Sequence, residues 1–434
     1  MVEGNSTAVT MLGLPGVVVL AVNEIDGEIE TTVETTTTRA WCHDCGVRAV
    51  GHGRREVVVR DIDIFDRHAR LRWRKRIWRC PESACPTVTW TETHPAVRSR
   101  AALTVRAERA ACRRVGRDNT PVAVVARDWG TGWHTIMRAV DRHGRELVDD
   151  PTRLAGVAAL GVDETAFLRA SAVRSTQFVS GLVDSATGRL LDVVEDRTAK
   201  AVMGWLAARD PAWLAAIGVV TLDPHRGFAN AIGYHLGHAT LVIDHWHAIR
   251  LANACVDDVR RRVQQDTLDH RGRTGDPLYG VRRVLLKAAE RLTDRQWRRL
   301  EAAWTAGDPR DEVYNAWAVK ELLRDVYAAA TIHDAQVALT EFYAWAHSCG
   351  VPETARLART VRRWEAEILA WHRTGGASNG PTEAVNLLIK KVQRTGHGFR
   401  NFSNYRLRLL LHCGVDWQDQ PAARLRRRQP RSAA

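Results

Sequence analysis

The strongest constraint on the fold is a run of strands and helices between residues 157 and 244. The segments VAALGVDETAF (157–167), STQFVSGLVD (175–184) and GRLLDVVED (188–196) are apolar, β-branched and separated by tight turns, which predicts three strands. We expect a helix over residues 198–208, a strand in IGVVTLD (217–223), a helix in GFANAIGYHL (227–236) and a strand in ATLVID (239–244). This element order is that of the RNase H-like α/β fold.

Acidic residues follow the apolar strand segments. Asp163 and Glu164 are neighbours on the first strand, and because adjacent strand residues face opposite sides, only one of them can face a site. Asp223 ends the fourth strand, and Glu383 begins the helix predicted in SNGPTEAVNLLIKKVQRT (378–395). Each acid alone fits a helix cap or a surface carboxylate equally well. Together, Asp163, Asp223 and Glu383 suit the binding of two Mg²⁺ (or Mn²⁺) ions about 3.5–4 Å apart. Such a metal pair activates the attacking oxygen and stabilises the leaving oxygen of a phosphodiester.

The helix that begins near Glu383 also carries cations. Lys390 follows Glu383 by seven residues, which is two helical turns, so both lie on one face. Lys391 and Arg394 follow closely. We expect the carboxylate to bind metal while Lys390, Lys391 and Arg394 contact a DNA backbone.

Charge is unevenly distributed along the 434 residues, whose formal net charge is +13. Residues 39–114 contain eighteen Lys and Arg against eight acids, and residues 384–434 contain eleven against two. The first 38 residues contain six acids and no Lys or Arg. Two basic regions around a neutral middle suit a polyanion such as nucleic acid, although a solvated basic surface gives the same count.

Four of the eight cysteines are clustered. WCHDCG supplies Cys42 and Cys45, and WRCPESACP supplies Cys80 and Cys85. Between them, residues 55–65 and 69–78 alternate like half-buried strands, so we predict a zinc-ribbon-like module with one structural Zn²⁺ on four thiolates. Two pairs of buried thiols are the alternative, and His43 and His52 are substitute ligands. The isolated cysteines are predicted to be packing residues: Cys112, Cys255, Cys349 and Cys413.

A helix-turn-helix is predicted after the zinc module. We expect a helix over residues 97–115, a short helix over residues 123–127 capped by Thr120 and Pro121, a turn at Gly130 and a second helix. The inward-facing residues of the second helix are Ile136, Met137 and Val140. The outward-facing ones, predicted to enter the DNA major groove, are His134, Thr135 and Arg138. A helical hairpin without DNA contacts is the alternative.

Two further segments complete the sequence. The apolar run at residues 8–22 is broken by Pro15 and lacks a basic start, so we interpret it as a strand rather than a signal peptide. Residues 246–372 are predicted to be helical, with tryptophans at i, i+7 spacing as core residues: Trp297, Trp304, Trp364 and Trp371. No stretch is as long as a membrane helix, so a cytoplasmic, nucleoid-associated protein without membrane contact is expected.

Together these motifs resemble the insertion-sequence transposases of the ISL-three type, within the DDE superfamily. The resemblance covers nearly the whole chain: the cysteine knuckles, the helix-turn-helix, GVDE (161–164), TLDPHRGFANAI (221–232), VIDHWHAIRLAN (242–253) and, most specifically, NGPTEAVNLLIKKVQRTGHGFRNF (379–402). It implies that Asp163, Asp223 and Glu383 are the catalytic triad and that an all-helical insertion separates the last two.

Some residues depart from the family pattern or keep two interpretations. His225 and Arg226 stand where the family usually has smaller residues, and Ala384 stands where it usually has glycine. Asp244 and His247, in the Asp-x-aromatic-His signature, either support the active site or its DNA, or form a second metal site.

The predicted organisation has six parts. They are a β-rich zinc module (1–95), a helix-turn-helix domain (96–150), the first part of an RNase H-like core (157–247), a helical insertion (248–375), the final core helix (376–415) and a basic tail (416–434). The expected function is transposition: binding of terminal inverted repeats in double-stranded DNA, cleavage of element ends, and joining of 3′-hydroxyls to target DNA by a dimer or larger assembly. A nuclease or resolvase that only cuts, and a DNA-binding regulator that has lost catalysis, are the alternatives.

Overall fold

The computed structural model describes residues 3–418, so most of the predicted basic tail lies outside the described residues. The chain divides into two compact units. The first holds the described residues up to Arg153 and those from Lys391 onward, and the second runs from Leu154 to Lys390. None of the described helices combines the length and the apolar character needed to cross a bilayer.

The first unit begins with a five-stranded sheet in the order β1-β2-β4-β3, with β5 added to β4. The strands are β1 (Val17–Ile25), β2 (Glu28–Thr35), β3 (Val50–Ile64), β4 (Arg67–Arg79) and β5 (Thr89–Thr91). Only the β2–β4 pair is parallel among these neighbours. Alternation along the strands places Val33, Val59, Leu71 and Trp73 in one buried core.

Helix α1 (Glu3–Leu12) corrects the prediction of a strand over residues 8–22. The strand β1 begins only at Val17. Ala8, Val9 and Leu12 recur at helical spacing and pack on the core of the sheet. Gly13 and Gly16 both have positive φ angles, so the chain turns around Pro15 before the strand can begin.

The other face of this sheet is covered by ion pairs. Alternate residues of β4 on that face are arginines: Arg70, Arg72, Arg74 and Arg76. The buried Glu30 of β2 binds Arg70 and Arg72 at 2.8 and 2.7 Å, and Glu34 binds Arg76 at 3.0 Å. Carboxylates of β2 therefore already compensate much of the positive charge of the β4 arginines.

Four helices follow in the first unit: α2 (Val105–Gly116), α3 (Val122–Asp128), α4 (Trp133–Val148) and, near the carboxyl end of the described chain, α16 (Phe402–Cys413). Helix α4 contacts α2, α3 and α16. The predicted helix at residues 97–115 starts too early, because the side chain of Thr104 caps α2 at the amide of Ala107. The predicted cap at Thr120 is also wrong: Pro121 occupies that position without a side-chain hydrogen bond.

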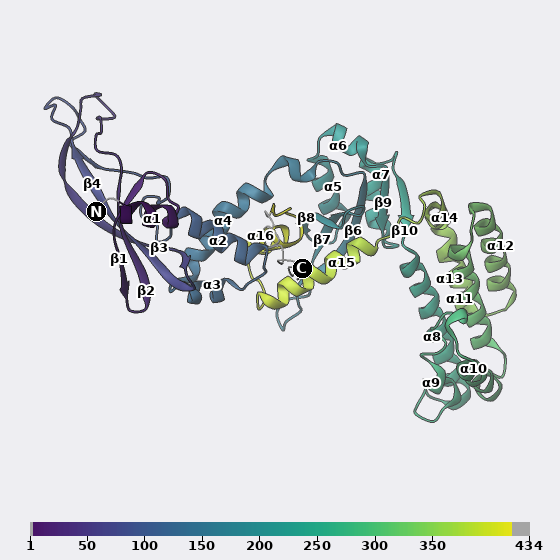
Figure 1. The fold of residues 1–434 in the computed structure, drawn as a ribbon. Coiled ribbons are helices and arrows are strands. Elements are labelled where there is room, and N and C mark those ends of the chain that lie inside the picture. Colours follow the sequence, from purple (N-terminus) through teal and green to yellow (C-terminus); the bar gives the residue numbers. More distant parts are fainter. Residues whose placement is uncertain (1–2, 419–434) are drawn as a thin grey trace, which may run out of the picture. The chain divides into compact units, whose positions relative to one another are not determined.

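The second unit contains a mixed sheet, labelled β6 to β10 in Figure 1, in the order β10-β9-β6-β7-β8. Its strands are β6 (Ala159–Leu168), β7 (Gln177–Asp184), β8 (Arg189–Glu195), β9 (Val219–Leu222) and β10 (Thr240–Ile243). The first three are antiparallel neighbours, whereas β9 is parallel to both β6 and β10. Helices α5 (Ala199–Ala207) and α7 (Arg226–His235) lie where the sequence predicted them, and α6 (Pro211–Ala216) is an additional short helix.

Helices make up most of the chain between β10 and Glu383, as predicted. They are α8 (His245–Leu268), α9 (Pro277–Val281), α10 (Asp294–Gly307), α11 (Glu312–Ala328), α12 (Ile332–Ser348), α13 (Pro352–Arg363), α14 (Glu365–Arg373) and then α15 (Gly380–Thr395). Two short 3₁₀ turns complete the described elements: η1 (Pro151–Leu154) and η2 (Ala289–Arg291). Trp304 and Trp364 are buried as expected, but Trp297 keeps 37% exposure while its ring packs against Trp304 and Trp317.

Candidate functional site

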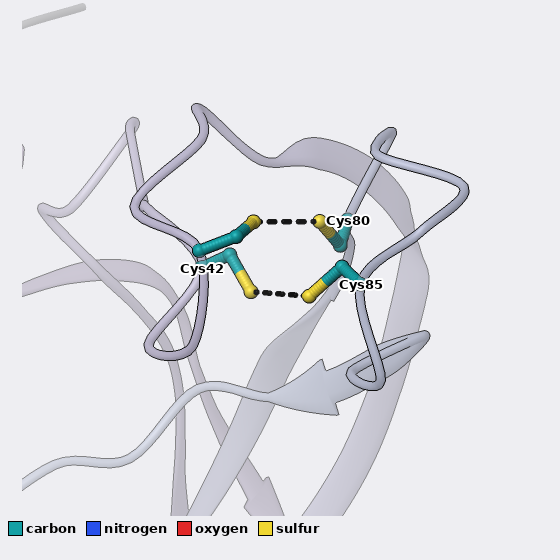
Figure 2. Close-up of side chains that lie close together, drawn as sticks. Cys42, Cys80 and Cys85 are labelled. Carbon is teal, nitrogen blue, oxygen red and sulfur yellow. Dashed lines mark hydrogen bonds between the residues drawn. The ribbon is translucent and has the colours of Figure 1, made fainter.

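The four clustered cysteines come together at one point. Their Sγ atoms all lie within 4.8 Å of one another, close enough for all four to bind one metal ion. Figure 2 shows the thiols facing each other from two loops, with Cys42 3.6 Å from Cys85 and Cys45 3.4 Å from Cys80. Zn–S bonds of about 2.3 Å in a tetrahedron require S–S separations of about 3.8 Å, so the four thiols fit a structural Zn²⁺.

The pKa values of the clustered thiols differ, because burial raises those of Cys80 and Cys85 whereas that of Cys42 is lowered. The backbone amide of Cys45, followed by that of Asp44, lowers the pKa of Cys42 to about 6. His43, a substitute ligand in the sequence interpretation, instead has a largely exposed ring near Thr87. His52 lies exposed on β3, outside the thiol cluster. The ligand set in the structure is therefore the four cysteines.

Asp163 and Asp223 are neighbours because of the sheet register. Strands β6 and β9 are parallel, and Val162 pairs with Leu222, so the next residue on each strand is an aspartate. Burial, followed by the charge of Asp223, raises the pKa of Asp163 to about 6. The carboxylate form of Asp163 is thus disfavoured mainly by its loss of water and secondly by the nearby charge of Asp223, and a bound cation would stabilise it.

Glu383, on the first turn of α15, reaches the same corner through a histidine. The buried Nε2 of His247 lies 2.8 Å from Asp223 Oδ1 and 3.1 Å from Glu383 Oε1. Burial lowers the pKa of His247, but the hydrogen bond and charge of Asp223 outweigh it, so the pKa lies above its usual value. His247 therefore bridges the second and third acids through a single ring nitrogen.

Asp163 is also linked to α15. The side-chain amide of Asn386, one turn after Glu383, donates to Asp163 Oδ2, and its oxygen accepts from Thr165 at 2.9 Å. The neighbouring Glu164 faces away and pairs with Arg197 at 3.4 Å. Of the two adjacent acids on β6, Asp163 is thus the one that faces the acid cluster, defined here as Asp163, Asp223, Glu383 and His247.

The segment before Glu383 is anchored by buried polar side chains that the sequence interpretation did not identify. Asn379 donates its backbone N–H to Asp244 at 2.6 Å and its side-chain amide to Asp223 at 3.4 Å. Asp244 also caps α8 by accepting from the amide of Trp246. Asp244 therefore ties two segments together, and it is His247 that contacts the acids. The available sequence signal was the run of small and polar residues in NGPT, directly before Glu383.

Glycine 161 permits the close approach of α15 to β6. A Cβ at this position would lie 2.1 Å from Oγ1 of Thr382, the residue before Glu383. Thr382 is fully buried, and its helix also buries Val385 and Ile389. The distance between the strand that carries Asp163 and the helix that carries Glu383 thus depends on the missing side chain.

The predicted DNA-contacting residues are all at least partly accessible. On α4, Ile136, Met137 and Val140 are buried, while His134 and Arg138 are exposed and Thr135 is intermediate. Lys390, Lys391 and Arg394 are exposed on α15. No ion pair of these three cations occurs in the part of the chain that the structure describes, which contrasts with the paired arginines of β4.

Comparison with known families agrees with this geometry. A transposase family model of the ISL3 type matches residues 160–409, which is more than half of the chain and includes all three acids. The chain belongs to this family of DDE transposases. A second model, the zinc-finger of transposase IS204/IS1001/IS1096/IS1165, matches residues 38–85 with all four cysteines. No curated protein matches the chain.

Membership in this family confirms the resemblance read from the sequence. The protein is a transposase, hence an enzyme that acts on DNA, and its amino-terminal module is a zinc ribbon.

Proposed function

We propose that this transposase binds the terminal inverted repeats of its insertion sequence, cleaves the element ends and joins the 3′-hydroxyls to target DNA. Asp163, Asp223 and Glu383 are the catalytic acids in this proposal. The observation that carries it is their convergence from β6, β9 and α15, with His247 in contact with two of them. Residues so far apart in sequence meet at the carboxyl end of β9, where its parallel pairing with β6 ends. Ligands of α/β sheets bind at such strand ends.

An RNase H-like core is the fold in this proposal. The sheet order β10-β9-β6-β7-β8, with antiparallel β6, β7 and β8 followed by parallel β9 and β10, supports it. The positions of the acids also support this fold. Asp163 lies on the central strand β6, Asp223 directly follows β9, and Glu383 lies at the start of α15. The core then comprises residues 157–247 and the helix with Glu383, and residues 248–375 form the insertion.

The chain's own residues prepare a site for hard cations. Carboxylates are the ligands that Mg²⁺ and Mn²⁺ prefer, and three of them converge here where a buried aspartate has a raised pKa. Two such ions, when bound, activate the attacking oxygen and stabilise the leaving oxygen of a phosphodiester. Asp163 is oriented by Asn386, and Asp223 by Asn379 and His247. These hydrogen bonds hold the acids in place before DNA arrives.

DNA binding is divided between two regions in this proposal. The exposed His134, Thr135 and Arg138 of α4 read the inverted repeat in the major groove, with α3 and α4 as a helix-turn-helix and the zinc ribbon as a second contact. Lys390, Lys391 and Arg394, which have no carboxylate partners among residues 3–418, hold the backbone near the scissile phosphate. Pairing of two element ends requires at least a dimer on DNA.

The test is strand cleavage and joining on duplexes that carry the repeats flanking the gene, with Mg²⁺ or Mn²⁺, beside a gel-shift assay. Asp163→Asn, Asp223→Asn and Glu383→Gln should each abolish cleavage and leave end binding intact. Glu164→Gln is the matched control, because it changes an adjacent acid that pairs with Arg197. Cleavage without joining would favour a nuclease, and binding without cleavage would favour a regulator.

A further inference from the structure

We propose that the rim of the acid cluster holds a nucleobase that is unpaired beside the scissile phosphate, with Trp246 as its stacking surface and Leu387 as an apolar contact. This inference rests on the proposed function and specifies the form of DNA that the site accepts. It comes from two exposed apolar side chains that the acid chemistry does not explain.

Trp246 lies beside His247, the residue that contacts two of the acids. Its backbone amide donates to the buried Asp244 at 2.8 Å, which fixes the first turn of α8. Its ring lies nearly perpendicular to that of His247, with 4.7 Å between the centroids, and His247 contacts both Asp223 and Glu383. Nevertheless 49% of Trp246 is exposed. An aromatic side chain fixed beside the acids and open to solvent is a ready surface for stacking.

A cation accompanies the ring. The guanidinium of Arg250, one turn further along α8, lies 5.1 Å from the centroid of the Trp246 ring. Arg250 is exposed, and no ion pair to it is found among the described residues. An indole and an unpaired guanidinium side by side suit a planar base that carries a phosphate.

Leu387 lies on the face of α15 that also carries Glu383. It follows Glu383 by one helical turn and precedes Lys390 by three residues, so the three side chains share one face of the helix. Leu387 is 67% exposed, although the opposite face of α15 buries Val385 and Ile389. Leucine contributes nothing to phosphate binding, but exposed apolar side chains in DNA-binding proteins contact or wedge between bases.

These features select an unpaired base over intact duplex. In a paired duplex the bases are stacked inside, so a site that approaches the scissile phosphate meets phosphates and sugars. An aromatic face, an apolar side chain and free cations beside the acids together match a base that has left the stack. Another half-exposed tryptophan of the same unit, Trp345, donates instead to Asn315 on α11 and belongs to no such group.

The experiment measures binding separately from cleavage. Full-length protein is titrated, with Ca²⁺ in place of Mg²⁺, into two repeat-bearing duplexes: one fully paired and one with a two-base mismatch beside the cleavage step. In a third duplex, 2-aminopurine at that step reports stacking through quenching of its fluorescence. The variants are Trp246→Ala, Trp246→Phe and Leu387→Ala. The controls are Trp345→Ala, which truncates a comparably exposed tryptophan, and Leu286→Ala, which truncates a partly exposed leucine (40%) outside the proposed rim.

Wild-type protein should prefer the mismatched duplex and quench 2-aminopurine. Trp246→Ala should bind the mismatched duplex on the order of tenfold more weakly and lose the quenching. Trp246→Phe should keep most of the affinity and most of the quenching. Leu387→Ala should reduce the preference for the mismatched over the paired duplex. Equal binding of both duplexes by the wild type, or equal losses on both by Trp246→Ala, would overturn the inference. Loss of self-association in the variants without DNA would instead identify a contact between copies. The assay measures binding without cleavage. A protein that stacks the base but does not cleave DNA would therefore contradict only the proposed function.

Discussion

Substitution of Gly161 by alanine tests the geometry of the acid cluster directly. The new Cβ would lie 2.1 Å from Oγ1 of Thr382, whereas nonbonded atoms settle at about 3.5 Å, so strand and helix must separate by about 1 Å. Overpacking of this kind costs about 1–3 kcal/mol of folding free energy. Because Glu383 directly follows Thr382, the separation moves Glu383 away from Asp163, and a displacement of about 1 Å typically reduces catalysis by about 100-fold.

The assay is strand cleavage on a repeat-bearing duplex, measured beside a thermal unfolding curve. We expect Gly161→Ala to remain folded, to bind element ends, and to cleave about 100-fold more slowly. The double variant Gly161→Ala, Thr382→Ala removes the clashing hydroxyl and should recover much of the cleavage rate. Gly181→Ala, on the neighbouring strand β7, is the control, since its Cβ would meet nothing closer than 3.8 Å. Unchanged cleavage by Gly161→Ala, or no recovery in the double variant, would refute the reasoning.

Three further predictions concern the zinc ribbon and DNA binding. Purified protein should contain about one zinc per chain by metal analysis, and a Cys42→Ser, Cys80→Ser variant should lose it; zinc retained by that variant would exclude the four-thiol site. Arg138→Ala should weaken binding of the repeat by about 1–3 kcal/mol in a gel shift but leave nonspecific binding unchanged, whereas Arg145→Ala, whose side chain already pairs within α4, should change neither. Lys390→Ala should reduce cleavage partially, with a loss that increases with salt; a salt-independent loss would argue against a phosphate contact.

Much of the second unit could be predicted from the sequence because its patterns are local. The apolar strands around Asp163 and Asp223 and the helix after them occur where alternation and turn residues placed them. The cysteine spacing likewise predicted a four-thiol site, since short knuckles bring their own ligands together. Burial of Ile136 and Val140 in α4 followed directly from helical periodicity.

Errors arose where local patterns were compatible with two structures. The apolar residues before Pro15 fit a strand as well as a helix, and packing of Leu12 on the sheet core selected the helix. The start of α2 was misplaced because Ala and Arg favour helices before and after the cap at Thr104 alike. Trp297 shares the i, i+7 spacing of core residues, yet its position at the edge of the aromatic group leaves it partly exposed.

By itself, the sequence indicated the candidate acids, the clustered thiols, most strands and helices of the second unit, and the cationic face of α15, because each depends on residue type or on spacing within one element. Only the tertiary structure decided that Asp163 rather than Glu164 faces the acid cluster, that Asp244 is an anchor while His247 contacts the acids, and that Asn386 reaches β6. These features depend on strand register and on a glycine-permitted contact between segments more than 200 residues apart. No local periodicity encodes such contacts, since they arise only when the buried faces of the strand and the helix pack together.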